Sequence, residues 1–385
     1  CWRRFGPYHH ARADAARTRL PLHTLEITSV DRTYAWDKIE TTEATHHRLS
    51  DTDVDDASRR ELQEGFTAAL EAIRPAVVVI PGWSARWVLV LLATCRRMGL
   101  RTVVMSESNA DDARRTRIGE AVKARLVQQF DAGFVGGTRA ADYLAALGLP
   151  RERITLGYDV VDNAHFAAPK GAALDAVRSR APSKPFFLSS ARFVPKKNLP
   201  GLLDAYAAYR RRVGTAAWDL VVLGDGEGRA ALENQRSALG LDDVVHLPGF
   251  TQYPELPAWY ALTAAFVLPS MAEQWGLVVN EAMAAGRPVL ASERCGCAAD
   301  LVRDGVNGFT FDPSDLDTMA GLMARIAHGD VDRATMGQAS REIIADWGPE
   351  RFAEGLQQAV EAALCAPSGR LTPLHHMLLQ ALVRR

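Results

Sequence analysis

Two glutamates in one short segment have the type and the spacing to hold the hydroxyl groups of a ligand. Glu273 and Glu281 lie in the run 273–286, whose apolar spacing predicts a loop that leads into a short helix. Gly276 falls near the helix start, where free backbone N–H groups and the positive end of the helix dipole favour an anion. A sugar joined to a diphosphate and a ribose would need this combination. The simpler alternative is an amphipathic helix with two solvated glutamates.

A basic loop supplies the charge that such a ligand would require. The strand predicted over 185–189 is followed by Arg192 and Lys197, and a helix is predicted to begin at Asn198. A guanidinium and an ammonium group at the carboxyl end of a strand could neutralise a diphosphate leaving group. For these residues taken alone, a basic loop that is merely solvated is an equally good explanation.

Two glycine turns follow later strands. Gly224 opens the turn 224–228 after a predicted strand at 219–223. Its glycines allow a tight turn and a close backbone approach, although they lack the G-x-G-x-x-G spacing of dinucleotide-binding proteins. Gly249 and Phe250 close the next strand, where backbone atoms of the loop could contact a nucleobase. Each turn by itself is an ordinary connection between a strand and a helix.

The first half of the chain offers candidates for contacts with an acceptor. His9 and His10 lie at an unusual entry into a helix. A histidine there could act as a general base or contact a phosphate, or it could cap and pack the helix instead. Glu107 and Asn109 belong to a polar cluster that follows a predicted strand at 102–105. This position suits contacts with acceptor hydroxyl groups.

The composition is that of a folded globular protein with no overall attraction for nucleic acid. The 385 residues carry a net charge of −1, with 48% hydrophobic and 24% charged residues. A basic run over 114–125 could face a phosphate or a membrane, but a solvated helix face explains it better. The longest apolar stretch, 87–95, is too short to cross a bilayer, and no signal peptide is predicted. The five scattered cysteines predict reduced thiols in the cytoplasm, and their single C-x-C pair is a weak metal signal.

The order of the predicted elements indicates a two-domain α/β protein. Strand-like runs alternate with helical patterns along almost the whole chain, which predicts parallel sheets with helices on both faces. A linker over 167–184 separates two such series, so we expect Rossmann-like domains over 1–167 and 168–346. Their ligand is expected at the carboxyl ends of the strands, in a cleft between the domains. No complete strand precedes Phe5, so either a first strand lies outside this sequence or the sequence begins inside it.

Taken together, these motifs resemble the GT-B glycosyltransferases, and among them glycosyltransferase family 4, the group 1 glycosyl transferases. The resemblance is close over 185–312 and rests on motifs in this order: Val161-Asp162 and Phe166, Arg192 and Lys197, Gly224-Asp-Gly, Pro248-Gly249-Phe250, and Glu273 and Glu281 with seven residues between them. It implies two Rossmann-like domains that face each other across a central cleft. The last helices, about 347–385, would cross back to the first domain.

The resemblance also implies roles for the matched residues. Arg192 and Lys197 would hold the diphosphate and Glu273 the hydroxyl groups of the donor sugar, and these three form the expected catalytic set. Glu281 would accept hydrogen bonds from the ribose. The other donor contacts would come from Gly224, Gly249, Phe250, Gly276 and Leu277. The family retains the anomeric configuration, uses no catalytic metal and has no cofactor besides its nucleotide-diphosphate sugar, and its departing phosphate is thought to take the acceptor's proton.

The chain departs from the family pattern on the acceptor side. The family's amino-terminal glycine-rich loop is missing, and residues 3–7 stand near its place. Ala191 also replaces the glycine that usually precedes the arginine. These departures bear on how His9, His10 and the other acceptor-side candidates would act.

The sequence therefore predicts a cytoplasmic, retaining, metal-independent glycosyltransferase that uses a nucleotide-diphosphate sugar. Its acceptor would be a hydroxyl group of a polysaccharide, a lipid-linked glycan or a small molecule, and peripheral contact with the inner face of the membrane stays open. One alternative is a GT-B nucleotide-sugar epimerase, which would need different catalytic acids. Another is a non-catalytic protein that binds nucleotide sugars.

Overall fold

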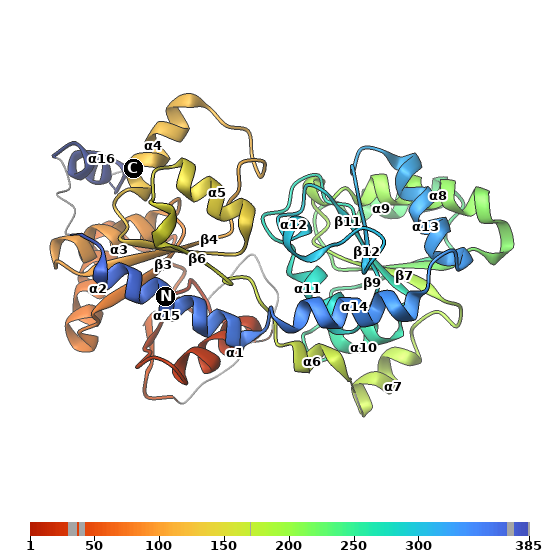
Figure 1. Ribbon diagram of the computed structural model, residues 1–385, viewed down its shortest axis with the longest axis horizontal. Coiled ribbons are helices and arrows are strands. Elements are labelled where there is room, and N and C mark those ends of the chain that lie inside the picture. The colour runs from red at the N-terminus through yellow and green to blue at the C-terminus, as the bar shows by residue number, and fades with distance from the viewer. Residues whose placement is uncertain (30–36, 38–42, 170, 368–372, 384–385) are drawn as a thin grey trace. The chain divides into compact units, whose positions relative to one another are not determined.

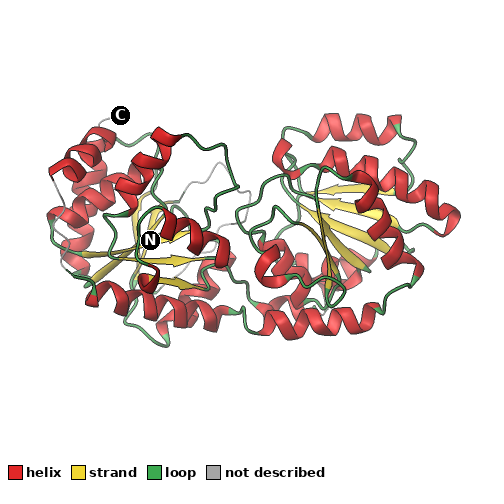
Figure 2. Ribbon diagram, turned by 45° about the horizontal axis from the view of Figure 1, so that its top comes forward, coloured by secondary structure: helices red, strands yellow, loops and turns green. Residues whose placement is uncertain are grey.

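The computed structural model describes residues 1–29, 37, 43–169, 171–367 and 373–383 and divides into two compact units. Unit 1 comprises Cys1–Val160 and Pro349–Arg385, and unit 2 comprises Val161–Gly348. Each unit has a parallel β-sheet covered by helices, as Figures 1 and 2 show. The sequence analysis placed the division at 167/168 and 346/347, whereas the units meet at Val160/Val161 and Gly348/Pro349.

The strands of unit 1 form two separate parallel sheets. One sheet has the order β3-β4-β5-β6, and its strands are Val77–Pro81, Arg101–Ser106, Ala132–Val135 and Ile154–Leu156. The other pairs β1 (Thr24–Thr28) with β2 (His46–Ser50). The sequence analysis predicted neither β2 nor β6, since β2 is polar and largely half-buried and β6 has only three residues.

The helices of unit 1 come from both ends of the chain. They are α1 (Pro7–Arg17), α2 (Arg59–Ile73), α3 (Arg86–Arg97), α4 (Arg117–Val127), α5 (Thr138–Ala146), α15 (Pro349–Cys365) and α16 (Pro373–Val383). Ser58 and Glu61 form a capping box at the start of α2: the Glu61 amide donates to Ser58 Oγ at 3.2 Å, and the Ser58 amide donates to Glu61 Oε2 at 2.7 Å. Helix α15 packs on α1 and on strands of the larger sheet (Figure 1).

Unit 2 holds one six-stranded parallel sheet in the order β12-β11-β10-β7-β8-β9. Its strands in chain order are Phe186–Ser190, Asp219–Leu223, Val245–Gly249, Ala265–Leu268, Val289–Ser292 and Gly308–Phe311. The chain builds outward from β7 in one direction and then returns to add β10, β11 and β12 on its other side. This reversal between β7 and β10 is where open α/β sheets bind their ligands.

The helices of unit 2 lie on both faces of this sheet (Figure 2). They are α6 (Asn163–Ala167), α7 (Ala172–Arg178), α8 (Leu199–Val213), α9 (Arg229–Ala238), α10 (Leu256–Leu262), α11 (Leu277–Ala284), α12 (Ala298–Leu301), α13 (Leu316–His328) and α14 (Arg333–Ala345). The predicted linker is wrong in one respect. Its alanine-rich part forms α7, because alanine favours helix and the buried Val177 side chain gives the helix an apolar anchor.

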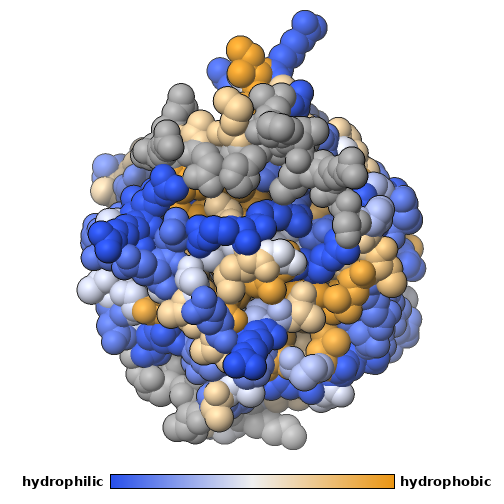
Figure 3. Space-filling model, turned by 90° about the vertical axis from the view of Figure 1, so that its left-hand side faces the viewer, coloured by the Kyte–Doolittle hydropathy of each residue, from blue (hydrophilic) through white to orange (hydrophobic). Residues whose placement is uncertain are grey.

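The described residues include no helix that could cross a membrane. None of the described helices is both long enough and apolar enough to span a bilayer. One face of unit 1 is mostly hydrophilic, with apolar side chains gathered in smaller groups between the polar ones (Figure 3).

Candidate active site

The loops that follow β7 and β10 lie side by side because these strands are neighbours in the sheet of unit 2. The first loop carries Arg192 and Lys197, and the second carries Glu273 and leads into α11. A backbone hydrogen bond of 2.8 Å from the Met271 amide to the Lys196 carbonyl joins the two loops. The motifs that the sequence analysis singled out in this half therefore gather at the carboxyl edge of one sheet.

The basic loop is held in place by the glycine turn after β8. The Phe193 amide donates to the Asp225 carbonyl at 2.8 Å, and the Gly228 amide donates to the Phe193 carbonyl at 2.9 Å. Gly224 has φ +121°, and a Cβ atom there would lie 1.9 Å from the Ala191 carbonyl oxygen. The close approach that these glycines allow is therefore to the basic loop. The structure gives Gly224 this packing role, which the sequence analysis did not foresee.

Lys197 and Glu273 form an ion pair at the centre of the site. The Lys197 ammonium contacts Glu273 Oε2, and the two side chains are only 13% and 12% exposed. Ser270 Oγ also donates to Glu273 Oε2, at 3.3 Å. Arg192 lies nearby in the same loop with an exposed side chain. The site thus has two cations in one loop and a carboxylate that is already fixed by two partners.

The Glu273 loop is held from its other side by the loop after β11. The Gly296 amide donates to the Glu273 carbonyl at 3.0 Å, and the Cys297 amide donates to the Trp275 carbonyl at 3.1 Å. The Trp275 side chain is buried, and its Nε1 donates to Asn280 Oδ1 in α11 at 3.0 Å. These bonds fix the path of the chain from the carboxylate into the helix.

Helix α11 begins directly after Gly276, whose φ of +105° favours glycine. Gly276 and Leu277 are half-buried, so the first turn of the helix is accessible at its amino end. The first N–H groups of a helix have no partner within it, and they attract anions together with the helix dipole. The start of α11 therefore offers an anion site next to Glu273.

Glu281 lies inside α11 and is 1% exposed. The alternative of an amphipathic helix with two solvated glutamates is therefore wrong, since both carboxylates are largely or fully enclosed by protein. Burial, then the negative charges of Asp162 and Glu281, raise the pKa of the nearby Tyr253. The sequence analysis missed Tyr253, whose only signal was an aromatic residue in the loop that follows β9.

Tyr253 belongs to a small aromatic cluster that connects the loop after β9 to α6. Its ring stacks on His165 with a centroid distance of 4.1 Å and an interplanar angle of 6°. A ring nitrogen of His165 also lies 3.2 Å from the Tyr253 carbonyl oxygen. The backbone amide of His165 donates to the side chain of Asp162, which caps α6. Phe166 packs edge-on against Tyr253. The cluster gives the Val161-Asp162 and Phe166 motif a structural role beside α11.

Gly249 and Phe250 close β9, farther along the sheet from β10. Gly249 has φ +97° and open space where a side chain would lie, and its carbonyl accepts from the Gly224 amide at 2.9 Å. The Phe250 ring is 39% exposed. An exposed aromatic ring at the carboxyl end of a strand suits contact with a flat base.

The acceptor-side histidines of unit 1 pack against aromatic rings. His9 Nδ1 accepts from the Gly6 amide at 3.0 Å, and its ring lies 4.8 Å from that of Trp2. Burial, followed by the charge of Arg12, lowers the pKa of His9 to about 3. His9 therefore performs the capping and packing role that the sequence analysis kept as an alternative. His10 packs against Phe5, and burial lowers its pKa as well.

Glu107 and Asn109 follow β4 in unit 1, as predicted from the sequence. Asn109 is buried, and its Oδ1 accepts from the Asp111 amide at 2.9 Å, which stabilises the turn. Glu107 is half-buried and interacts with the fully buried Asp159, whose pKa is raised by burial and then by Glu107. Arg12 lies 3.7 Å from Asp159 and opposes this shift. The sequence analysis did not find Asp159 or Arg12.

Metal ligation finds no support among the residues that the structure describes. No group of three or more His, Cys, Asp or Glu side chains there could hold a metal ion. The five cysteines are all thiols, and burial raises the pKa of Cys297 in the C-x-C pair.

The part of the chain that carries this site is similar to known glycosyltransferases. Residues 173–343 match the family model for group 1 glycosyl transferases. A GDP-mannose-dependent α-(1-6)-phosphatidylinositol monomannoside mannosyltransferase of Mycobacterium tuberculosis is 35% identical over 179 residues, which are 44% of this chain and 46% of the relative. A D-inositol 3-phosphate glycosyltransferase of Nocardia farcinica is 28% identical over 76% of this chain and 68% of its own. The first match thus spans about half the length of the relative.

Solved structures extend the likeness to nearly the whole chain. A glycosyltransferase from Rickettsia africae superposes with a TM-score of 0.73 at 9% identity, covering 95% of this chain and 98% of its own. Anabaena HepE, solved in complex with UDP, superposes with a TM-score of 0.68 at 18% identity, covering 82% and 86%. The predicted fold class is confirmed: the chain has the GT-B fold, and most of its unit 2 is similar to the group 1 glycosyl transferases.

Proposed function

We propose that the protein transfers a sugar from a nucleotide-diphosphate sugar to a hydroxyl group of an acceptor. One observation carries the proposal: the largely enclosed ion pair of Lys197 and Glu273 lies at the sheet reversal of unit 2, beside the open amino end of α11. Cations and helix N–H groups stabilise the charge that develops on a leaving diphosphate. Glu273 and Glu281 supply the acceptors for sugar and ribose hydroxyl groups.

Lys197 and Glu273 exchange partners when the donor binds. Without a ligand the carboxylate neutralises the ammonium group and orients it. A diphosphate then takes over Lys197 and Arg192, while Glu273 accepts hydrogen bonds from the donor sugar. Because the pair is largely enclosed, each charge has a stronger effect on the leaving group than it would have in water. Lys197, Arg192 and Glu273 are therefore the catalytic residues of this proposal.

The reaction retains the anomeric configuration and needs no catalytic metal in this proposal. Two observations support this part of the proposal: the likeness to the family and the positive charge close to the site. Two cations and the amino end of a helix can stabilise the leaving diphosphate, as a divalent metal ion does in metal-dependent enzymes. The bond between the anomeric carbon and the phosphate oxygen breaks, the acceptor oxygen takes its place on the same face, and the acceptor's proton goes to the departing phosphate. No cofactor besides the donor takes part.

The donor carries uracil or guanine in this proposal, because HepE was solved with UDP and the mycobacterial relative is named for GDP-mannose. The acceptor is a hydroxyl group on a polysaccharide, a lipid-linked glycan or a small molecule. A cytoplasmic protein that touches the membrane through α4 would fit the lipid-linked case. Exposed Arg117 and Arg125 on α4 flank Ile118, which is 81% exposed, and together they suit an anionic lipid surface. Sedimentation with anionic vesicles, compared between wild type and Ile118→Ser, would test this contact.

Release of nucleotide diphosphate tests the transferase proposal. UDP-sugars and GDP-sugars are incubated with the protein with and without a panel of hydroxyl acceptors, and free UDP or GDP is measured. Acceptor-dependent release that Lys197→Ala abolishes supports transfer. A changed sugar without any release would favour the epimerase, and tight donor binding without turnover across the whole panel would favour a binding protein. Either result would overturn the proposal.

A further inference from the structure

The basic loop of unit 2 ends on a backbone conformation that is rare outside glycine. Asn198 has φ +53° and ψ +35°, which is the left-handed helical region. Among the described residues other than glycine, only Arg74 also has a positive φ, and Arg74 caps the end of α2, where this conformation is common. Asn198 instead lies between Lys197 and the start of α8. The rare conformation therefore falls directly beside a residue of the candidate site.

The left-handed conformation of Asn198 leads the chain from a short 3₁₀ turn, Pro195–Lys197, into α8. The Asn198 amide donates to the Pro195 carbonyl at 3.1 Å and closes the turn. The Asn198 carbonyl accepts from the Leu202 amide at 3.1 Å and opens the helix. Lys197 is the last residue of the turn, so the direction in which its side chain leaves the backbone depends on the conformation of Asn198.

The side chain of Asn198 ties the basic loop to the loop after β12. Its Nδ2 donates to the Pro313 carbonyl at 2.9 Å. Its amide group also lies over the first turn of α8, because a Cβ atom at Gly201 would be only 2.5 Å from Asn198 Oδ1. Gly201 thus leaves the room that this side chain occupies. Strands β7 and β12 are not neighbours in the sheet, so the bond to Pro313 joins loops that the strand pairing does not bring together.

Lys197 therefore lies between two anchored residues. The Lys196 carbonyl accepts from the Met271 amide in the loop after β10, and Asn198 is bound to the loop after β12. A lysine side chain is long and flexible, so its ammonium group keeps one place only if its backbone is fixed. The two anchors supply that fixed backbone for the ion pair with Glu273.

We infer that Asn198 is a positioning residue for Lys197. Its left-handed backbone and its bond to Pro313 direct the Lys197 ammonium group toward Glu273. The use of this ammonium group to hold a diphosphate rests on the function proposed above, but its placement does not. The simpler alternative is that Asn198 only begins α8. In that case its replacement would lower the stability of unit 2 and leave the Lys197 side chain in its place.

Labelling of the two neighbouring lysines tests this placement without any ligand. The protein is treated with a limiting amount of an amine-acetylating reagent, and mass spectrometry gives the ratio of Lys197 to Lys196 modification. The ratio should be low in the wild type, because Lys197 is 13% exposed and paired whereas Lys196 is exposed. Asn198→Ala should raise it several-fold, since alanine loses the bond to Pro313 and is strained in the left-handed region. Asn198→Gly should raise it less, because glycine adopts this conformation freely.

A matched control separates the placement of Lys197 from the stability of unit 2. Asn163→Ala removes a similar bond of 2.8 Å, from Asn163 Nδ2 to the Ile344 carbonyl, and should leave the labelling ratio at its wild-type value. Gly201→Ala displaces the Asn198 side chain without replacing it, so it should raise the ratio, and it serves as the test if Asn198→Ala does not fold. An unchanged ratio in the variants at 198 and 201 would overturn the inference, as would an equal rise in the control.

A double-mutant cycle tests whether Asn198 acts on a ligand through Lys197. Affinities for UDP and GDP are measured by calorimetry in the wild type, Asn198→Ala, Lys197→Ala and the double variant. Asn198→Ala should weaken nucleotide binding by about fivefold in the wild-type background and have no effect in the Lys197→Ala background. Equal losses of affinity in both backgrounds would contradict a role through Lys197. If neither nucleotide binds the wild type, the proposed donor site is wrong, and the labelling ratio alone decides the inference.

Discussion

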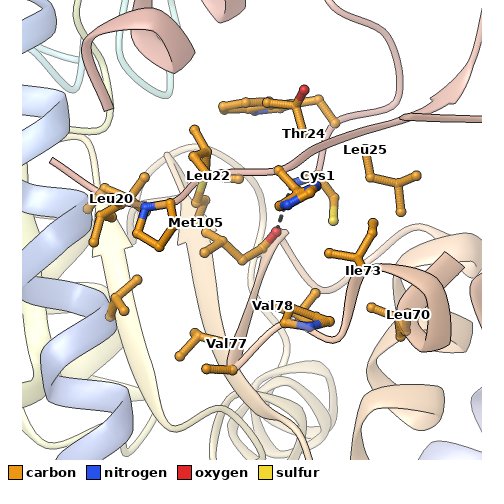
Figure 4. Close-up of a pocket in the computed structure, with 18 of the residues that line it drawn as sticks. Cys1, Leu20, Leu22, Thr24, Leu25, Leu70, Ile73, Val77, Val78 and Met105 are labelled. Carbon is orange, nitrogen blue, oxygen red and sulfur yellow. Dashed lines mark hydrogen bonds between the residues drawn. The ribbon is translucent and has the colours of Figure 1, made fainter. Parts of the chain in front are cut away.

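Unit 2 and unit 1 are both parallel α/β structures, but their candidate ligand regions are built differently. In unit 2 the loops after β7, β8, β10 and β11 are joined by backbone hydrogen bonds around Lys197 and Glu273, so the site is formed by contacts between neighbouring strand ends. In unit 1 the sheet is divided by an apolar cavity (Figure 4), and the candidate histidines are packed against aromatic rings. The candidate region of unit 2 is thus held by backbone hydrogen bonds between loops, whereas the candidate histidines of unit 1 are held by packing on aromatic rings.

The largest expected effect is on the donor side. Lys197→Ala should lower kcat/KM by about 10²–10³-fold, or about 2.7–4 kcal/mol of transition-state stabilisation, as for other groups that stabilise a leaving charge. The matched control is Lys196→Ala, because the Lys196 side chain is exposed and its carbonyl contact is kept. Steady-state rates with a saturating acceptor measure both. Similar rates for the two variants would remove Lys197 from the catalytic set.

The second prediction concerns how the loops of unit 2 are held. Gly224→Ala should destabilise unit 2 by about 3 kcal/mol, because its Cβ would lie 1.9 Å from the Ala191 carbonyl oxygen and φ is +121°. Gly249→Ala meets open space at φ +97° and should cost only about 1 kcal/mol of backbone strain. Urea unfolding of the two variants checks the difference. Equal losses of unfolding free energy in the two variants would mean that the contact of Gly224 with the basic loop does not affect the stability of unit 2.

The third prediction tests the burial of His9 in unit 1. Its pKa is lowered from 6.5 to about 3 in the folded protein, so below pH 6.5 the unfolded chain binds a proton that the folded protein does not. The protonation of His9 therefore does not lower the free energy of unfolding above pH 6.5. Below that pH it lowers the free energy of unfolding by about 1.4 kcal/mol per pH unit, down to about pH 3. Hydrogen exchange in α1 between pH 7 and pH 5 measures the slope.

Two variants assign that slope to His9. His9→Gln keeps an acceptor for the Gly6 amide but does not titrate, so its stability should fall less steeply than that of the wild type. His328→Gln, on the exposed end of α13, should follow the wild type. If His9→Gln and the wild type lose stability in parallel, His9 does not titrate from a buried site.

The sequence located the strand-end motifs of unit 2 well, because each one is local: a buried strand, a glycine or a cation, and then a helix. It could not predict that Lys197 and Glu273 form an ion pair, since 76 positions separate them in the chain and the pairing follows from the strand order. It also could not show that Gly224 accommodates the carbonyl of Ala191, and the donor contact expected of Gly224 stays a prediction. Contacts between loops that are far apart in the chain cannot be predicted from the residue pattern of a single sequence.

Unit 1 was harder to predict for a related reason. Strand β2 is polar and half-buried, so its sequence lacks the apolar alternation that predicts a strand. Its extended conformation is stabilised by its hydrogen bonds to β1. The ring contacts of His9 and its bond from Gly6 decide between a catalytic and a capping histidine, and neither contact can be derived from the residue type. The buried Asp159 carries no local signal at all, because its partner Arg12 lies in α1.

Nucleotide binding to unit 2 tests the central claim most directly. Calorimetric titration with UDP, GDP, ADP and dTDP is carried out on the wild type, on Glu281→Gln and on Glu227→Gln, whose side chain is exposed in the glycine turn. We expect one nucleotide to bind the wild type and the Glu227→Gln control equally. Glu281→Gln should weaken that binding by about 1.5–3 kcal/mol, the usual contribution of hydrogen bonds to a charged group. Equal affinity in all three proteins, or no binding of any nucleotide, would contradict a donor site at α11.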